Sequence, residues 1–299
     1  MNLVIPTPKE FSFKRTVLSH GWCELPPFHF DPQKWVLSRV VAVEGEAPIE
    51  VAIAQKGASI DVAISGKIGK KQSTALAQSI RYMLRLDESF NDFYALVSDD
   101  PDFSWIPAQG AGRLLRAPTV FEDLVKMICT TNCSWALTSK MVGVLVSTLG
   151  EPSKRGRRTF PTPQAMSKMP ERFYRDKVGA GYRSGYLKEL ADMVASNEID
   201  VEGWLKSDLP TSELKKEIKR VKGAGDYVAE NILKLLGRYD GLALDSWVRG
   251  KFSKMHAKGR AVTDKKIARH YSRFGPWVGL ALWCDMTRDW MGEAGTVEI

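Results

Sequence analysis

The sequence has few cysteines and no long apolar run, and these two absences exclude several classes of protein. Four of its 299 residues are cysteine, and they are scattered too widely for a disulfide framework, a zinc site or an iron–sulfur cluster. Charged residues interrupt every apolar stretch before it reaches the roughly 18 residues that a membrane helix needs. The first residues lack the basic and then apolar order of a signal peptide. We therefore expect a reducing compartment, the cytoplasm and nucleoid or a nucleus, and no association with a membrane.

Positive charge is present in excess and is unevenly distributed. The formal net charge is +8, from 43 lysines and arginines and 35 aspartates and glutamates. Residues 1–108 contain 11 basic and 13 acidic side chains, whereas residues 109–299 contain 32 basic and 22 acidic ones. The basic excess in the second part indicates that this part faces a polyanion such as nucleic acid.

The first part of the chain has the pattern of an antiparallel sheet. Apolar residues alternate with period two in three short runs, 35–43, 49–54 and 60–64. Pro48 and Gly57 stand between these runs. Short alternating runs at close spacing are typical of antiparallel strands with one buried face.

The remainder of the chain has helical spacing. From about Pro118 onward, apolar residues recur at intervals of three and four, and Thr119 is placed to cap a helix that extends through Ile128. The predicted fold class is therefore α+β. An N-terminal antiparallel β-sheet domain with flanking helices, residues 1–108, precedes a mainly α-helical domain, residues 109–299.

A glycine turn between two apolar helical stripes is the most informative segment. Residues 214–236 contain one stripe before Gly223-Ala224-Gly225 and another after it. Two glycines at that spacing let the backbone turn tightly and let main-chain N–H groups approach an anion. Three basic residues precede the turn: Lys219, Arg220 and Lys222. The segment predicts a helix-hairpin-helix motif that binds nucleic-acid phosphates, although a plain helical hairpin with a glycine turn has a similar pattern.

An aspartate follows this hairpin at the start of another helical pattern. Asp245 comes after the apolar run 241–244 and is followed by Ser246 and Trp247. Aspartate in such a position commonly caps the helix by accepting hydrogen bonds from its free N–H groups. A carboxylate beside a phosphate-binding hairpin can also stabilise the positive charge that develops on a sugar when its glycosidic bond breaks. The two roles are compatible.

The hairpin and this aspartate together resemble the helix-hairpin-helix DNA glycosylase superfamily (HhH-GPD). Four further segments are similar to its 8-oxoguanine glycosylase and inducible 3-methyladenine DNA glycosylase branches and occur in the same order: 112–116, 128–132, 179–183 and 274–277. Members of these branches also have an N-terminal antiparallel β domain. The resemblance covers nearly the whole chain.

The resemblance implies roles for individual residues. Asp245 corresponds to the essential aspartate of the superfamily. Four residues correspond to its DNA-binding turn: Lys222, Gly223, Ala224 and Gly225. Asn132 corresponds to the residue that fills the gap left by the flipped base, Tyr182 to the wedge that kinks the DNA, and Arg183 to the neighbour that contacts the opposite base.

A base pocket and an ion site are also implied by the resemblance. Five residues are expected to line the pocket for the extruded base: Trp135, Tyr227, Asn231, Trp247 and Trp283. The backbone carbonyls of Lys219, Val221 and Ala224 are expected to hold a structural monovalent cation, Na⁺ or K⁺. No cofactor is expected for catalysis itself.

Three departures from the superfamily pattern bear on the reaction and the substrate. Bifunctional members have a nucleophilic lysine where this chain has Tyr227, and a phenol cannot form the Schiff base that leads to strand cleavage. Gly279 replaces the glutamine that reads 8-oxoguanine, and Leu137 replaces an arginine that contacts the opposite cytosine. The aromatic pocket residues instead suit electron-poor or cationic bases.

These features predict a monofunctional DNA N-glycosylase of base excision repair, a hydrolase that leaves an abasic site in double-stranded DNA. The favoured substrate is an alkylated base of the 3-methyladenine or 7-methylguanine type, and the protein is expected to act as a monomer. Three alternatives remain: a bifunctional oxidised-purine glycosylase and AP lyase, a glycosylase for another modified base, and a non-catalytic module that recognises damaged DNA.

Overall fold

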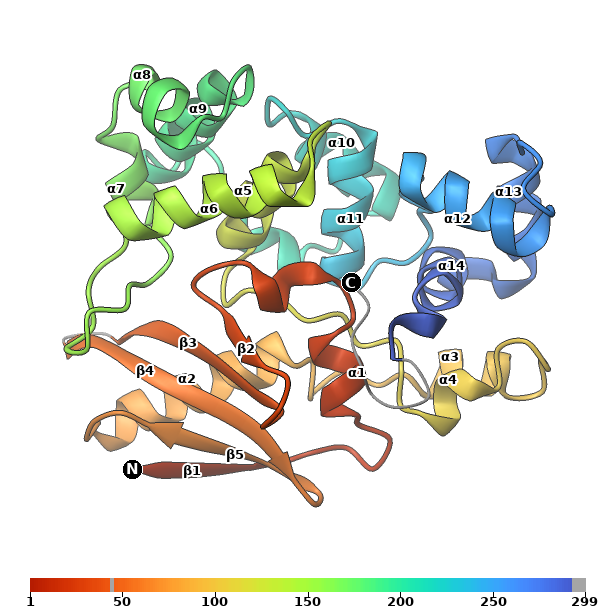
Figure 1. Cartoon of the computed structure of the whole chain (residues 1–299), viewed down its shortest axis with the longest axis horizontal. Coiled ribbons are helices and arrows are strands. Elements are labelled where there is room, and N and C mark those ends of the chain that lie inside the picture. Colours follow the sequence, from red (N-terminus) through yellow and green to blue (C-terminus); the bar gives the residue numbers. More distant parts are fainter. Residues whose placement is uncertain (44–45, 292–299) are drawn as a thin grey trace.

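The computed structural model describes residues 1–43 and 46–291, so the last part of the predicted second domain, residues 292–299, lies outside the described residues. Figure 1 shows a β-sheet at one end of the molecule and helices over the rest of it. The sheet comes first in the sequence and the helices follow, which confirms the α+β class predicted above. Within the described ranges, no helix is long and apolar enough to cross a membrane.

Within the described part of the chain, the sheet has five antiparallel strands in the order β1-β5-β4-β3-β2. The strand bounds are β1 Asn2–Pro6, β2 His29–Asp31, β3 Val36–Val43, β4 Glu46–Lys56 and β5 Ser59–Ile64. The three predicted strands correspond to β3, β4 and β5. The two edge strands were not predicted, because β1 has consecutive apolar residues, Leu3 to Ile5, in place of an alternation and β2 has only three residues.

Pro48 does not separate two strands as its position suggested, because β4 extends through it. The register between β3 and β4 shifts at this point: Val41 pairs with Ile49, whereas Val43 pairs with Glu46. A bulge of this kind interrupts the regular ladder of hydrogen bonds, so it accommodates a proline that has no N–H to donate.

The helical elements form the rest of the molecule. The α-helices are α1 Phe13–Val17, α2 Lys70–Met83, α3 Asn91–Ser98, α4 Trp105–Ala108, α5 Val120–Thr130, α6 Trp135–Leu149, α7 Pro163–Ser167, α8 Glu171–Phe173, α9 Arg183–Ala195, α10 Thr211–Lys219, α11 Asp226–Leu236, α12 Ser246–His256, α13 Asp264–Tyr271 and α14 Val278–Met286. The short 3-10 or π segments are η1 Gly21–Glu24, η2 Tyr174–Val178, η3 Glu202–Lys206, η4 Ser272–Trp277 and η5 Arg288–Trp290. The predicted cap of α5 is confirmed, since the Thr119 hydroxyl accepts a hydrogen bond from the Glu122 N–H at 3.2 Å.

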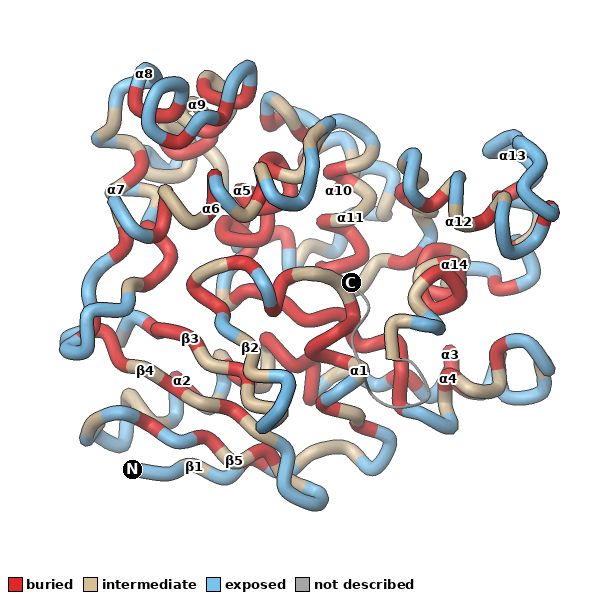
Figure 2. Tube along the Cα trace, viewed as in Figure 1, coloured by how far each residue is buried: buried red, intermediate tan, exposed pale blue. Residues whose placement is uncertain are grey.

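A buried ionic cluster joins the sheet to the helical part. Arg39 of β3 donates to the carboxylate of Glu122 on α5 at 3.0 Å, and Lys126 donates to the same carboxylate at 2.7 Å. All three side chains are buried. Figure 2 shows buried segments in the sheet and, beyond it, in α5, α11 and α14. The two predicted domains therefore share a continuous core.

The segment 112–116, which contributes to the family resemblance, has a structural role. Arg116 and Arg85 are buried and donate to backbone carbonyls at the C-terminal end of α11, which lack partners within the helix. Both guanidiniums also pair with Glu88. This arrangement fixes α11, the second helix of the hairpin, against the chain that connects the two domains.

Candidate active site

The predicted hairpin is formed by α10 and α11, and its two glycines serve different purposes. Gly223 has φ +87°, and a Cβ there would lie 2.7 Å from the Cδ2 atom of Tyr186. Gly225 has φ −68° and is the N-cap of α11, and a Cβ on it would meet no atom within 4 Å. Gly223 is therefore needed for the turn, whereas Gly225 leaves the start of α11 open to an approaching anion.

Two lysines of the hairpin are exposed and paired with acidic residues. Lys219 lies 3.0 Å from Asp226, and Lys222 lies 2.7 Å from Glu189 of α9. Exposed ion pairs of this kind contribute little to stability and are screened by salt. A phosphate group can therefore compete for these ammonium groups without a large cost to the fold.

The predicted gap-filling and wedge residues lie side by side. Asn132 is exposed with φ +45°, in the left-handed region, and its Nδ2 atom lies 3.4 Å from the Tyr182 hydroxyl. Tyr182 is 53% exposed, and its ring meets the ring of Tyr186 edge to face. Since Tyr186 also packs under Gly223, these residues and the hairpin belong to one connected surface.

Arg183 has different surroundings from those expected of a base-contacting residue. Its side chain is buried, and its guanidinium donates to the hydroxyl and the backbone carbonyl of Thr131. The group therefore supports the loop that carries Asn132. Contact between Arg183 and an opposite base stays a prediction.

A cavity of about 420 Å³ lies beside Asp245. Its lining includes the predicted catalytic residue and all five predicted pocket residues: Asp245, Trp135, Tyr227, Asn231, Trp247 and Trp283. They come from α6, α11, α14 and the start of α12, so the fold brings together residues that are distant in sequence. A larger groove of about 740 Å³, between β3, α2 and α5, is lined by none of them.

The position of Asp245 is fixed from two sides. Its Oδ1 atom accepts a hydrogen bond from the Val248 N–H at 2.7 Å, so it caps α12 as predicted. The loop before it is held by Glu230 of α11, whose carboxylate accepts a hydrogen bond from the Ala243 N–H at 2.5 Å. Ala243 has φ +51°, a strained conformation for alanine that this contact helps to maintain.

Tryptophans form one wall of the cavity. The ring centres of Trp247 and Trp283 lie 5.9 Å apart, and Trp290, which the sequence analysis missed, lies 5.8 Å from Trp247 and 5.9 Å from Trp283. The indole N–H of Trp283 donates to the Ser19 carbonyl at 2.7 Å, which fixes the orientation of the ring. Trp135 donates to Glu24 at 2.6 Å.

Four residues of α11 line the cavity at helical spacing: Tyr227, Asn231, Lys234 and Leu235. Burial, with the nearby charge of Asp245, raises the pKa of Tyr227 to about 12, so its phenol is protonated at neutral pH. The amide of Asn231 donates to the Tyr227 carbonyl at 2.9 Å.

Lys234 was missed by the sequence analysis. Its ammonium is buried, donates to the Leu242 carbonyl at 3.0 Å and lies 5.7 Å from the centre of the Trp283 ring. Burial lowers its pKa to about 8, while the carboxylates of Glu230 and Asp245 favour the charged form. Lys234 follows Asn231 by three residues and Tyr227 by seven, and this helical spacing could have identified it as a residue that faces the cavity.

The N-terminal part of the chain also contributes to the cavity, through His20, Gly21 and Trp22. Burial lowers the pKa of His20 to about 4, so its ring is neutral, and its Nε2 atom lies 2.7 Å from the Leu115 carbonyl. The indole of Trp22 donates to Asp123 of α5 at 2.6 Å. No local pattern in the sequence linked these residues to the site.

Gly279 has no space for a side chain. A Cβ at this position would lie 2.0 Å from the Gly241 carbonyl oxygen and 2.8 Å from that of Tyr239. Both contacts are with backbone, which cannot move aside easily. A glutamine could not occupy this position in the present fold.

The chain is similar in fold to solved DNA glycosylases. No protein-family model matches it. A probable N-glycosylase/DNA lyase of Methanothermobacter thermautotrophicus is 24% identical over 235 residues, which are 69% of this chain and 73% of that protein. The 3-methyladenine DNA glycosylase of Archaeoglobus fulgidus superposes with a TM-score of 0.74 at 20% identity, covering 95% of this chain and 98% of that one.

A second structure extends the comparison to a DNA complex. The 8-oxoguanine glycosylase/lyase of Clostridium acetobutylicum, bound to double-stranded DNA with cytosine opposite 8-oxoguanine, superposes with a TM-score of 0.71 at 17% identity. The match covers 96% of this chain and 95% of that one. Together with the hairpin and the N-terminal sheet, these likenesses show that the chain has the fold of the helix-hairpin-helix (HhH-GPD) DNA glycosylases.

Proposed function

We propose that this protein is a monofunctional DNA N-glycosylase, which removes a modified base by hydrolysis and leaves an abasic site. The observation that carries the proposal is the position of Asp245, whose carboxylate borders an aromatic cavity next to the phosphate-binding hairpin. A glycosidic bond inside a base stack cannot be reached, so the enzyme must extrude the nucleotide into such a cavity.

In the proposed reaction, the carboxylate of Asp245 stabilises the positive charge that develops at C1′ as the glycosidic bond breaks. Water that this carboxylate orients then attacks C1′. Tyr227 stands where a lyase would have its lysine, and its protonated phenol can pack against the base or the sugar but cannot form an imine. The strand therefore stays intact.

Double-stranded DNA is the proposed partner, bound by a monomer of the protein. The hairpin residues 222–225 contact the phosphate backbone, Asn132 fills the gap left by the base, and Tyr182 opens the stack. The DNA-bound glycosylase of Clostridium acetobutylicum, which has the same fold, supports this mode of binding. Such an enzyme acts where DNA is, in the cytoplasm and nucleoid or in a nucleus.

The turn of the hairpin suits a structural Na⁺ or K⁺ ion. The Val221 carbonyl accepts one hydrogen bond, from the Ala224 N–H at 3.0 Å, and an oxygen of this kind has a second lone pair. Lys219 is the last residue of α10, where carbonyls lack partners within the helix. The carbonyls of Lys219, Val221 and Ala224 would hold the ion, which would stiffen the turn.

An alkylated base of the 3-methyladenine or 7-methylguanine type is the substrate that we favour. The tryptophans of the cavity offer electron-rich faces, on which a cationic or electron-poor base stacks well. Gly279 leaves no side chain that could read the edge of 8-oxoguanine from that position. The Archaeoglobus fulgidus protein of the same fold is a 3-methyladenine glycosylase.

Lys234 favours a second candidate, an oxidised purine or another base with a carbonyl acceptor. With a pKa of about 8, this buried side chain is largely charged at neutral pH. A fixed positive charge beside the cavity disfavours a cationic base and suits a carbonyl oxygen. The Clostridium acetobutylicum protein of the same fold is an 8-oxoguanine glycosylase/lyase.

The proposal is tested with duplexes that each contain one modified base, incubated with the protein and then treated with hot alkali to cut abasic sites. We expect cleavage after alkali at an alkylated purine and none without alkali. Release of 8-oxoguanine instead would favour the second candidate, and strand breaks before alkali would identify a lyase. Tight binding to damaged duplexes with no base release would identify a non-catalytic module.

A further inference from the structure

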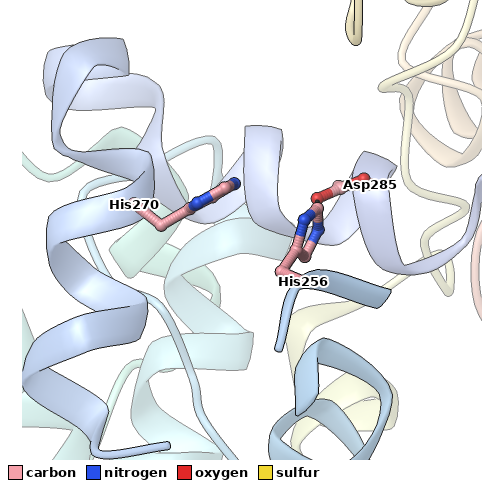
Figure 3. A group of neighbouring side chains, drawn as sticks. All are labelled: His256, His270 and Asp285. Carbon is pink, nitrogen blue, oxygen red and sulfur yellow. Dashed lines mark hydrogen bonds and ion pairs between the residues drawn. The ribbon is translucent and has the colours of Figure 1, made fainter. Parts of the chain in front are cut away.

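Three side chains that can bind metal ions meet at a place outside the cavity. His256, His270 and Asp285 each offer one ligand atom, and these atoms lie within 4.8 Å of one another. Figure 3 shows that the three side chains point toward one another from α12, α13 and α14. Two imidazoles and one carboxylate form a common ligand set for zinc and related transition metals.

The backbone around this cluster favours a cation. His256 is the last residue of α12, His270 is the next to last of α13, and Asp285 is the next to last of α14. The C-terminal end of a helix carries partial negative charge from its unpaired carbonyls. Each of the three side chains therefore lies at or next to a helix end that favours a nearby positive charge.

Asp285 lacks a permanent positive partner. Its side chain is 6% exposed, and its Oδ2 atom accepts a hydrogen bond from the Tyr271 hydroxyl at 2.6 Å and lies 2.8 Å from His256 Nε2. No lysine or arginine in the described part of the chain forms an ion pair with it. A buried carboxylate at a helix C-terminus is costly unless a cation compensates for its charge.

His270 has an available ligand atom. Its ring stacks at an angle on that of His256, with 4.5 Å between the ring centres, but it makes no side-chain hydrogen bond to any described residue. The neighbouring Arg273 directs its guanidinium to Asp100, at 3.0 and 2.9 Å, and to the His270 carbonyl. The positive charge of Arg273 is therefore already paired.

We propose that His256, His270 and Asp285 form a binding site for a divalent transition-metal ion such as Zn²⁺, with water in the remaining position. A tetrahedral zinc ion with bonds of about 2.0 Å holds its ligand atoms about 3.3 Å apart. The His256 Nε2 and Asp285 Oδ2 atoms are already 2.8 Å apart, and the His256 side chain is 24% exposed at the end of its helix, where it has room to adjust to an ion. Tyr271 orients the carboxylate from behind, as second-layer partners of metal ligands commonly do.

An ion in this position would tie together the helices that form one wall of the cavity. Trp247 lies at the other end of α12 from His256, and Trp283 precedes Asp285 by two residues on α14. The ion would hold α12, whose N-cap is Asp245, against α14. The proposal does not depend on the proposed base chemistry, because metal binding is measured without DNA.

The test is calorimetric titration of Zn²⁺ into the full-length protein after its metals have been removed with EDTA. We expect one ion to bind per chain, and His256→Ala and His270→Ala each to weaken binding about tenfold or more. His29→Ala is the matched control, because His29 is exposed on β2 and lies far from this cluster in sequence. The affinity of the His29→Ala variant for Zn²⁺ should equal that of the parent protein. Zn²⁺ should raise the melting temperature of the parent and of His29→Ala, and that of His256→Ala by much less.

Three results would overturn the proposal. They are the absence of saturable binding to the parent protein, unchanged affinity in both single variants, and a Co²⁺ spectrum with thiolate charge-transfer bands, which would assign the ion to cysteine instead. Circular dichroism in EDTA identifies any variant that fails to fold. His256→Ala remains informative even if His270→Ala is unstable, because His256 is partly exposed at the end of its helix.

Discussion

The carboxylate of Asp245 accepts a hydrogen bond from the Val248 N–H at 2.7 Å while it borders the aromatic cavity. One side chain therefore both starts helix α12 and faces the proposed reaction. A substitution that removes only the charge tests the role of Asp245 in the reaction, whereas one that also removes the cap affects stability as well. The two effects can therefore be measured separately.

We expect Asp245→Asn to reduce single-turnover base release by about 10²–10³-fold or more, because a neutral amide cannot stabilise an oxocarbenium-like sugar. Asparagine caps helices as well as aspartate does, so the fold should be unaffected, whereas Asp245→Ala should lose about 1 kcal/mol of stability. Release rates in excess enzyme and duplex affinity are measured on the same preparations. Near-parental release by Asp245→Asn would remove this carboxylate from the mechanism.

The sequence was sufficient to predict the structural features that depend on the spacing of neighbouring residues. The hairpin with its glycine turn, the cap at Asp245 and the alternation in β3 to β5 each depend on a few neighbouring residues, and each is present in the structure. The edge strand β1 depends on pairing with β5, about 60 residues later in the chain, and β2 has only three residues, so neither has a local pattern that the sequence reveals.

The cavity was predictable in part, for a similar reason. The resemblance identified the residues on α6, α11, α12 and α14, but the side that His20 and Trp22 form comes from the N-terminal part of the chain. Their contribution depends on long-range contacts, such as the hydrogen bond from Trp22 to Asp123. Helical spacing alone would have placed Lys234 beside Asn231. The sequence around Lys234, which lies between two leucines, does not indicate that its side chain is buried.

The two glycines of the hairpin should respond differently to substitution. Gly223→Val should destabilise the protein, because φ is +87° and the new side chain would collide with the Tyr186 ring. Gly225→Val should fold, because its φ of −68° suits any residue and the space around it is open, but it should weaken binding to every duplex by obstructing the phosphate. Thermal unfolding and duplex affinities at several salt concentrations separate the two effects. A loss of affinity confined to one DNA sequence would contradict the role assigned to the hairpin.

The parent protein should not form a covalent complex with DNA on treatment with borohydride. Tyr227 is protonated at neutral pH, since burial raises its pKa to about 12, and a phenol forms no imine with C1′. Tyr227→Lys is expected to install weak trapping, because an amine would then stand at the lyase position. Denaturing electrophoresis of labelled duplexes detects the complex. Efficient trapping by the parent would direct attention to Lys234, the lysine that lines the cavity, and Lys234→Gln would then abolish it.

Lys234 should lower the stability of the protein at neutral pH, and the effect should disappear in alkali. Its pKa is about 8 in the folded protein, below the ordinary value of 10.5, because burial disfavours the ammonium. Below pH 8 both the folded and the unfolded chain carry the proton, and the burial of the charge costs about 3 kcal/mol. Between pH 8 and 10.5 the unfolded chain binds more protons than the folded one, so the stability attributable to this group rises with pH.

Lys234→Met should therefore be more stable than the parent at pH 7, and the difference in unfolding free energy should shrink by pH 10. Urea denaturation at pH 7 and pH 10 measures the difference in unfolding free energy between Lys234→Met and the parent. A difference that does not change with pH would contradict the assigned pKa.

The Lys234→Met variant also distinguishes the two candidate substrates. If the base is cationic, removal of the neighbouring ammonium should speed its release, because a repulsive charge is lost. If the base presents a carbonyl to Lys234, release should slow, because a charge-assisted hydrogen bond is lost.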